Sequence, residues 1–271
     1  MYIDLSKYNR VTDWKAVSEN VEGVILRVGY RGYGSGKIVI DSMFESYAKA
    51  CYNYGIPIGL YFMSQAITPM EGVEEADFAL NYAEKYNAAL PIFIDSEDGD
   101  GTSRIVRADA LNKSDRTDVC EYFCKTVNNC RHKAGIYAST SWFENRLDVK
   151  RLDKYLLWVA QYGPKCTAKH RVDMWQYTSK GSVPGISGNV DCSIKYGFPN
   201  PNTKPLYRTL RMGDTGSDVK ELQSKLNLKY NSGLKIDGVF GRNTYNAVIK
   251  MQKLNGIKVD GIVGEQTRKY L

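Results

Sequence analysis

The chain has 271 residues, of which 43% are hydrophobic and 25% charged, with a formal net charge of +7. This composition is ordinary for a globular protein, and the length suits either one large domain or one of about 200 residues with a small partner. Its apolar runs are all well short of the roughly 18 residues that a membrane helix needs. The chain also does not begin with the basic residues and apolar segment of a signal peptide. We therefore expect synthesis in the cytoplasm without a signal peptide, and no membrane insertion.

The strongest β patterns alternate with helix-length segments over the first 195 residues. The expected strands, in chain order, are 2–5, 23–28, 58–62, 91–95, 134–138, 156–160, 172–176 and 189–191. Helical patterns lie between several of them, at 42–54, 71–86 and 116–130. This alternation predicts an α/β fold with a mostly parallel sheet, and eight strands in this length predict an irregular TIM-like β/α barrel with some crossover helices reduced or missing.

Two carboxylates end the fourth expected strand. Residues 91–94 are apolar and lead into Asp95, Ser96 and Glu97. Because strand side chains repeat with period two, Asp95 and Glu97 lie on one side, with Cα atoms roughly 6.5 Å apart. Of two neighbouring carboxyl groups, one can act as the acid and the other as the base, as glycoside hydrolysis requires. The alternative is an acidic solvated loop, but Asp4 and Asp191 also fall at expected strand ends, where barrel enzymes hold their active sites.

The glycine-rich segment 29–37 follows the second strand but lacks the spacing of a phosphate-binding loop, because Arg31 and Ile38 replace required residues. A flexible loop over a cleft is the better interpretation. With two histidines and no paired cysteine motif, a metal site is not expected, and neither is a cofactor. The six cysteines, all before residue 193, are expected to be reduced structural thiols.

The end of the chain has a different character. A proline-rich linker is expected at 198–207, and residues 201–271 contain 13 Lys and Arg against 6 Asp and Glu, which accounts for the whole net charge. A D-G-x-x-G-x-x-T phrase begins at Asp237 and again at Asp260. Helical apolar stripes precede and separate the phrases, and they are expected to be core: Val219, Leu222 and Leu226, then Val248, Met251 and Leu254. These patterns predict a compact, basic helical module of about 60 residues, whose charge either attracts an anionic partner or is merely solvated.

Both parts resemble known families. Residues 1–197 resemble the Chalaropsis-type lysozymes, glycoside hydrolase family 25, in these phrases: Ile3-Asp4-Leu5-Ser6, the segment 55–61, the D-x-E signature within 91–97, Met174-Trp175-Gln176-Tyr177 and Gly188-Asn189-Val190-Asp191. Residues 208–271 resemble the three-helix peptidoglycan-binding domain in Gly216, Val219, Leu222-Gln223, both D-G-x-x-G-x-x-T phrases and Leu271. The pairing is typical of phage endolysins and bacterial autolysins.

The resemblance implies cleavage of the β-1,4 bond between N-acetylmuramic acid and N-acetylglucosamine in peptidoglycan. It implies that Glu97 is the general acid, that Asp95 stays ionised and stabilises developing positive charge, and that Asp4 and Asp191 complete the active site. Arg27 either balances these charges or has a partner on the outer face of the barrel. Aromatic residues expected to bind the sugars are Tyr61, Tyr137, Trp158 and Tyr162.

Other interpretations stay open at this point. A non-catalytic wall-binding protein would not need both acids, and a chitinase would have further aspartates before the D-x-E pair, where Pro91 and Phe93 stand here. An amidase or peptidase is the remaining alternative. The expected partner is bacterial peptidoglycan, with anionic wall polymers as a further candidate and no role for nucleic acid.

Overall fold

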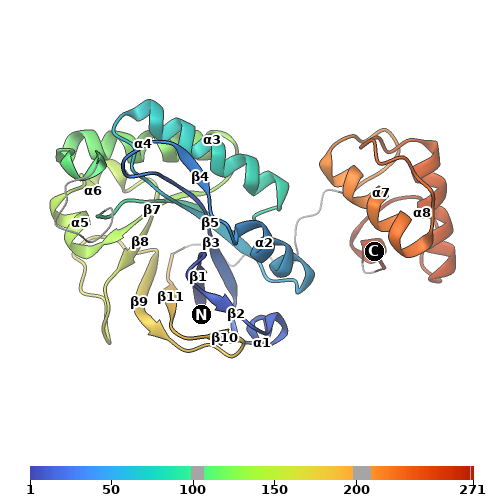
Figure 1. Ribbon diagram of the computed structural model, residues 1–271, viewed down its shortest axis with the longest axis horizontal. Helices are drawn as coiled ribbons and strands as arrows, with labels where there is room; N and C mark the ends of the chain where they lie inside the picture. The colour runs from blue at the N-terminus through green and yellow to red at the C-terminus, as the bar shows by residue number, and fades with distance from the viewer. Residues whose placement is uncertain (99–106, 198–208, 269) are drawn as a thin grey trace. The chain divides into compact units, whose positions relative to one another are not determined.

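The structure, a computed structural model, describes residues 1–98, 107–197, 209–268 and 270–271 (Figure 1). The chain divides into two compact units, Met1–Pro205 and Leu206–Leu271. The expected linker, 198–207, lies outside the described residues, so the boundaries proposed from the sequence stay predictions.

Eight strands of the first unit form a closed ring. In ring order they are β1 (Tyr2–Leu5), β11 (Val190–Lys195), β9 (Met174–Gly181), β8 (Leu156–Ala160), β7 (Ala134–Ser139), β6 (Ile92–Asp95), β5 (Ile58–Met63) and β3 (Gly23–Arg31), and β3 pairs with β1 to close it. Neighbours are parallel except in the two pairs that contain β11. The expected TIM-like barrel is confirmed, and its eight strands are the eight expected from the sequence.

Helices cover the outside of the ring between most of the consecutive parallel strands (Figure 1). The three expected helices are α2 (Phe44–Asn53), α3 (Pro69–Lys85) and α4 (Lys113–Asn129), and α3 packs against α4. Shorter elements that the sequence analysis missed are α1 (Trp14–Asn20), η1 (Arg107–Ala110), α5 (Thr140–Asn145), α6 (Val149–Leu152), β2 (Arg10–Val11), β4 (Ile38–Ile40) and β10 (Ile186–Ser187). Residues 161–173, between β8 and β9, contain no helix, as expected for a barrel with reduced crossovers.

Strand period decides which side chains face the inside of the ring. In β6, Ile92 and Ile94 pack in the large core between ring and helices, whereas Phe93 packs in a second cluster with side chains of other ring strands. A Cβ atom on Gly135 of β7 would come within 2.5 Å of the Phe93 ring, so only glycine fits beside it. The barrel interior is therefore filled by a layer of large side chains, above which the next inward residue of β6 is Asp95.

The second unit is a small helical module with its own core. Its helices are α7 (Ser217–Tyr230), α8 (Arg242–Leu254) and α9 (Glu265–Arg268). Two isolated β-bridges, Leu210 with Val263 and Thr215 with Val239, join the segments before the helices. The apolar stripes form the core as expected, with one exception: Leu254 is 66% exposed, because it is the last residue of α8.

A buried glutamine organises each D-G-x-x-G-x-x-T phrase. The Gln223 side-chain amide contacts Asp237, Val239 and Thr244, and its Oε1 accepts from the backbone N–H of Gly238. Gln252 makes the same contacts with the second phrase, through Asp260, Ile262, Thr267 and Gly261. Gly238 and Gly261 have φ angles of 78° and 71°, a backbone that favours glycine. The internal repeat is thus a repeated turn, each built on one buried side chain.

Candidate active site

A pocket of about 190 Å³ opens at the edge of the ring where the parallel strands end. The residues lining it are Asp4, Tyr61, Asp95, Glu97, Tyr137, Trp158, Tyr162, Gln176 and Asp191. All eight site residues named from the sequence are therefore brought together. The ninth, Gln176, was not named as a site residue, although its place two residues after the inward-facing Met174 could have indicated it.

The antiparallel direction of β11 brings Asp191 to this edge. Asp191 is the second residue of β11 and pairs with Asp4 of β1 in the ladder. The expected end of a strand at Asp191 is wrong, because the strand continues to Lys195. Since β11 runs opposite to its neighbours, its beginning lies beside their carboxyl ends, and the carboxyl group still reaches the pocket.

A chain of hydrogen bonds crosses one side of the pocket. The Tyr137 and Tyr162 hydroxyls both donate to Gln176 Oε1, over 2.9 and 3.2 Å. Gln176 Nε2 in turn donates to Asp4 Oδ2 over 2.9 Å. The glutamine therefore couples two aromatic residues of the wall to a carboxyl group, which holds their positions relative to one another.

The four aromatic residues differ in what they can offer to a ligand. Trp158 is 1% exposed, stacks edge-on against Tyr61, Phe93 and Tyr137, and donates its indole N–H to Ser193 Oγ. It forms the floor of the pocket, so its ring faces are occupied by protein. Tyr162 is 58% exposed and has the surface that a sugar ring could cover.

Burial raises the pKa values of all four carboxyl groups, and repulsion from neighbouring negative charges adds to it for Asp4, Asp95 and Glu97. For Glu97, burial first and then the charges of Asp191 and Asp98 raise the pKa to about 7. Burial, followed by the charge of Asp191, raises the pKa of Asp4 well above its ordinary range, and burial raises that of Asp191. Carboxyls this close lose their protons in separate steps, so the cluster retains protons near neutral pH.

Asp95 is more deeply buried than Glu97. It is 3% exposed, and its Oδ1 has no hydrogen-bond partner among the described residues. Burial and then the charges of Glu97 and Asp4 raise its pKa well above the ordinary range, while Arg27 lowers it. These surroundings favour a protonated Asp95, which differs from the ionised state that the resemblance implies.

The contacts of Arg27 show which of the two roles left open by the sequence it has: balancing the charges of the site, or pairing on the outer face of the barrel. Its Nε and Nη2 both lie 2.7 Å from Asp41 Oδ2, and its guanidinium packs over the rings of Tyr8 and Tyr30. The side chain is buried, and its charge still lowers the pKa of Asp95. Arg27 thus has Asp41 as its ion-pair partner and balances part of the negative charge of the site.

Known proteins match both units. The model of the family described as "Glycosyl hydrolases family 25" matches residues 3–186, and that of a "Putative peptidoglycan binding domain" matches residues 215–271. An autolytic lysozyme of Clostridium acetobutylicum is 28% identical over 261 residues, which cover 93% of this chain and 72% of the relative.

Solved structures show the same fold. The modular autolysin LytC of Streptococcus pneumoniae, in complex with a synthetic peptidoglycan ligand, aligns with a TM-score of 0.62 and 26% identity over 72% of this chain. The alignment spans 46% of LytC. The catalytic domain of endolysin ply40, from bacteriophage P40 of Listeria monocytogenes, aligns with a TM-score of 0.57 and 26% identity, over 72% of this chain and 92% of that domain.

Proposed function

Because this chain belongs to glycosyl hydrolases family 25, we propose that it is a lysozyme that cleaves the β-1,4 bond between N-acetylmuramic acid and N-acetylglucosamine in peptidoglycan. The observation that carries the proposal is the pocket in which Asp4, Asp95, Glu97 and Asp191 meet. The similarity to an autolytic lysozyme along 93% of the chain supports the same activity. A chitinase or a peptidase has no comparable support.

Glu97 is the general acid in this proposal. A group that protonates the leaving oxygen must hold its proton near the working pH, and Glu97 has its pKa raised to about 7. It follows the end of β6 by two residues and is more accessible than Asp95, so it can approach the bond from the open side of the pocket. Its proton passes to the glycosidic oxygen as the bond breaks.

Asp95 supplies negative charge as positive charge develops on the sugar. Arg27 lowers the pKa of Asp95, and an oxocarbenium-like transition state lowers it further by the same electrostatic effect. The ionised form of Asp95 is therefore more strongly favoured in the transition state than in the complex with unreacted substrate. An interaction that is stronger in the transition state accelerates the reaction. In this proposal Asp95 releases its proton to solvent when substrate binds, so that Asp95 is ionised and the proton that the cluster retains is on Glu97, ready for transfer to the leaving oxygen.

The second unit holds the enzyme on its substrate. Support comes from the match of residues 215–271 to a peptidoglycan-binding domain and from the excess of Lys and Arg beyond residue 200. We propose that the module binds peptidoglycan, with long-range attraction to anionic wall polymers as an added contribution. The helices within the described ranges include none long and apolar enough to cross a membrane.

The test compares the wild type with Glu97→Gln on purified cell walls. We expect the variant to lose at least about 100-fold in the rate of clearing, because a side-chain amide is far too weak an acid to protonate the leaving oxygen. New reducing sugar ends without new free amino groups should accompany wild-type clearing. Equal clearing by the two proteins would remove Glu97 from the mechanism. Binding without any clearing by the wild type would indicate a non-catalytic wall-binding protein.

A further inference from the structure

A hairpin lies beyond the one ring strand that contributes no described residue to the lining of the carboxyl pocket. Among the described residues, the pocket lining comes from every strand of the ring or the segment after it, except β3. β3 instead continues into a hairpin with β4, joined by residues 32–37, whose ends are closed by the bond from Gly32 N–H to the Lys37 carbonyl. This hairpin turn is the segment that the sequence suggested as a flexible loop over a cleft.

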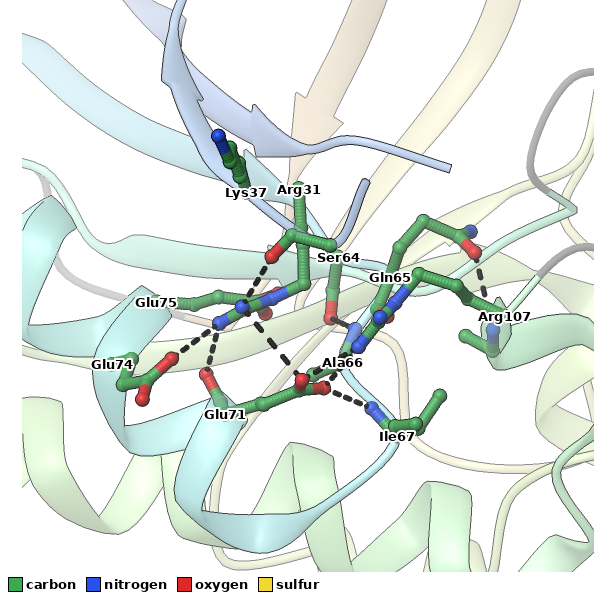
Figure 2. A network of polar contacts seen from close by, with 12 residues as sticks. Arg31, Lys37, Ser64, Gln65, Ala66, Ile67, Glu71, Glu74, Glu75 and Arg107 are labelled. Carbon is green, nitrogen blue, oxygen red and sulfur yellow. Dashed lines mark hydrogen bonds and ion pairs between the residues drawn. The ribbon is translucent and has the colours of Figure 1, made fainter. Parts of the chain in front are cut away.

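Arg31 ties the hairpin turn to α3 (Figure 2). The guanidinium is 4% exposed and donates to the Gly36 carbonyl over 2.8 Å, to the buried Glu75 over 2.7 Å and to Glu74 over 3.0 Å. It also donates to the backbone carbonyl of Glu71. A buried arginine with this many acceptors is held in one geometry, so the turn is anchored rather than loose.

Arg107 supports the same turn from the other side. It donates to both carboxylate oxygens of Glu71, over 2.6 and 2.7 Å, and to the Gln65 carbonyl over 3.0 Å (Figure 2). Its guanidinium packs against Gly36, where an added Cβ atom would overlap it. Gly36 also has a φ of 65°, so a side chain there is disfavoured both by its backbone and by the neighbouring arginine.

Tyr33 of the anchored turn is not part of the described lining and lies beside the pocket rim, next to the strand end that carries Asp95. The Tyr33 hydroxyl lies 3.5 Å from Met63 Sδ, and Met63 pairs with Asp95 across β5 and β6. A thioether is a weak acceptor, and it is the partner that the described residues provide for this hydroxyl. Burial and then the charges of Asp95 and Glu97 raise the pKa of Tyr33 to about 12, so the phenol stays protonated and can donate a hydrogen bond.

We propose that Tyr33 is a substrate-binding residue that donates a hydrogen bond to an oxygen of a sugar ring on the β3 side of the carboxyl pocket. The inference rests on the proposed function, since a glycan is the polymer that would extend past this rim. Peptidoglycan sugars carry hydroxyl and acetamido oxygens, which are better acceptors than the Met63 sulfur. Arg31 and Arg107 hold the turn that carries Tyr33 before the substrate arrives.

The first experiment measures hydrolysis of soluble glycan fragments by Tyr33→Phe, with Tyr122→Phe as the matched control. Tyr122 is 46% exposed on α4 and has no part in the pocket. We expect Tyr33→Phe to raise KM about fivefold with little change in kcat, since it removes one hydrogen bond and keeps the ring. The control should match the wild type. A KM equal to the wild-type value would overturn the assignment.

A second measurement separates this inference from the proposed function. Binding of the same fragments is compared between Glu97→Gln and the double variant Glu97→Gln/Tyr33→Phe, and we expect about fivefold weaker binding by the double variant. If the wild type does not cleave but the double variant binds more weakly, the proposed function fails and Tyr33 stands. If the wild type cleaves but the two bind equally, Tyr33 fails and the function stands. Absence of both cleavage and binding would overturn both.

The anchoring network is tested through Gly36→Ala. Displacing the turn should raise KM in an otherwise wild-type protein, and it should add little in a Tyr33→Ala background, because the hydroxyl that it misplaces is already gone. Additive effects of the two substitutions would show that the turn acts independently of Tyr33, which would contradict the proposed role of the network.

Discussion

At the scale of single residues, the site depends on how charges share one buried space. Asp191 is the charged neighbour that contributes most to the raised pKa of Glu97, after burial itself. An acid that must be protonated is active below its pKa, so kcat/KM should fall as pH rises through about 7. We therefore expect kcat/KM to be higher on the acidic side of neutrality than on the alkaline side.

Replacing Asp191 by Asn should move that fall in kcat/KM to lower pH. Removing a negative charge near Glu97 makes its ionisation easier, which lowers its pKa. The measurement is a pH profile of kcat/KM, with Asp77→Asn as the control because Asp77 is exposed on α3. A profile that stays in place, or that moves to higher pH, would contradict the assignment of Glu97 as the titrating acid.

At the scale of elements, two buried glutamines show how short turns obtain their shape. Gln252 is fully buried, and its side chain satisfies the backbone N–H of Gly261 and the carbonyl of Ile262. Backbone groups buried in a turn have no ladder partner, so a side-chain amide, which both donates and accepts, is suited to the task. The same solution occurs at Gln223 for the first phrase.

The substitution Gln252→Ala should destabilise the small module by about 3 kcal/mol, because it leaves several buried polar groups without partners. Native-state hydrogen exchange of the α8 amides in the full chain measures opening of this unit separately from the barrel. Gln266→Ala, on the exposed side of α9, serves as the control and should change the opening free energy little. Equal protection in the two variants would show that the turn does not depend on Gln252.

At the scale of the whole molecule, the net positive charge and the catalytic carboxyl groups lie in different parts of the chain. The core of the module shares no described residue with the two core clusters of the barrel, so each unit has its own apolar interior. The excess of basic residues lies entirely beyond residue 200, whereas the pocket carboxyls all belong to the barrel. Wall retention and bond cleavage should therefore be separable.

In the Glu97→Gln background, the full chain should pellet with purified walls more strongly than a chain ending at residue 200. The difference should shrink as ionic strength rises from about 0.01 to 1 M, because screening shortens the Debye length from about 30 to 3 Å. Sedimentation with purified walls across this salt series measures both effects. Equal retention of the two chains at every salt concentration would refute the anchoring role of the module.

The main elements and the carboxyl site could be predicted because they depend on local patterns. The eight ring strands follow from apolar runs, Asp95 from period two along β6, and Glu97 from its place two residues beyond the end of that strand. The short helices and β2, β4 and β10 could not be predicted in this way, because they are too short to show a period. The prediction that Leu254 belongs to the core is wrong for a related reason. The helical period continues to the last residue of a helix, whereas a side chain at that end need not be covered by other residues.

What the order of residues decides is the chemistry present: which side of each strand carries a carboxyl, where the turns fall and where positive charge accumulates. What only the folded chain decides is which of these groups meet. Positions far apart in the sequence are joined by the reversed direction of β11, by the hydrogen bonds of Gln176 and by the contact of Arg107 with the hairpin turn that carries Tyr33. Such contacts depend on ring closure and on burial, and the raised pKa values of the pocket follow from them and not from any local motif.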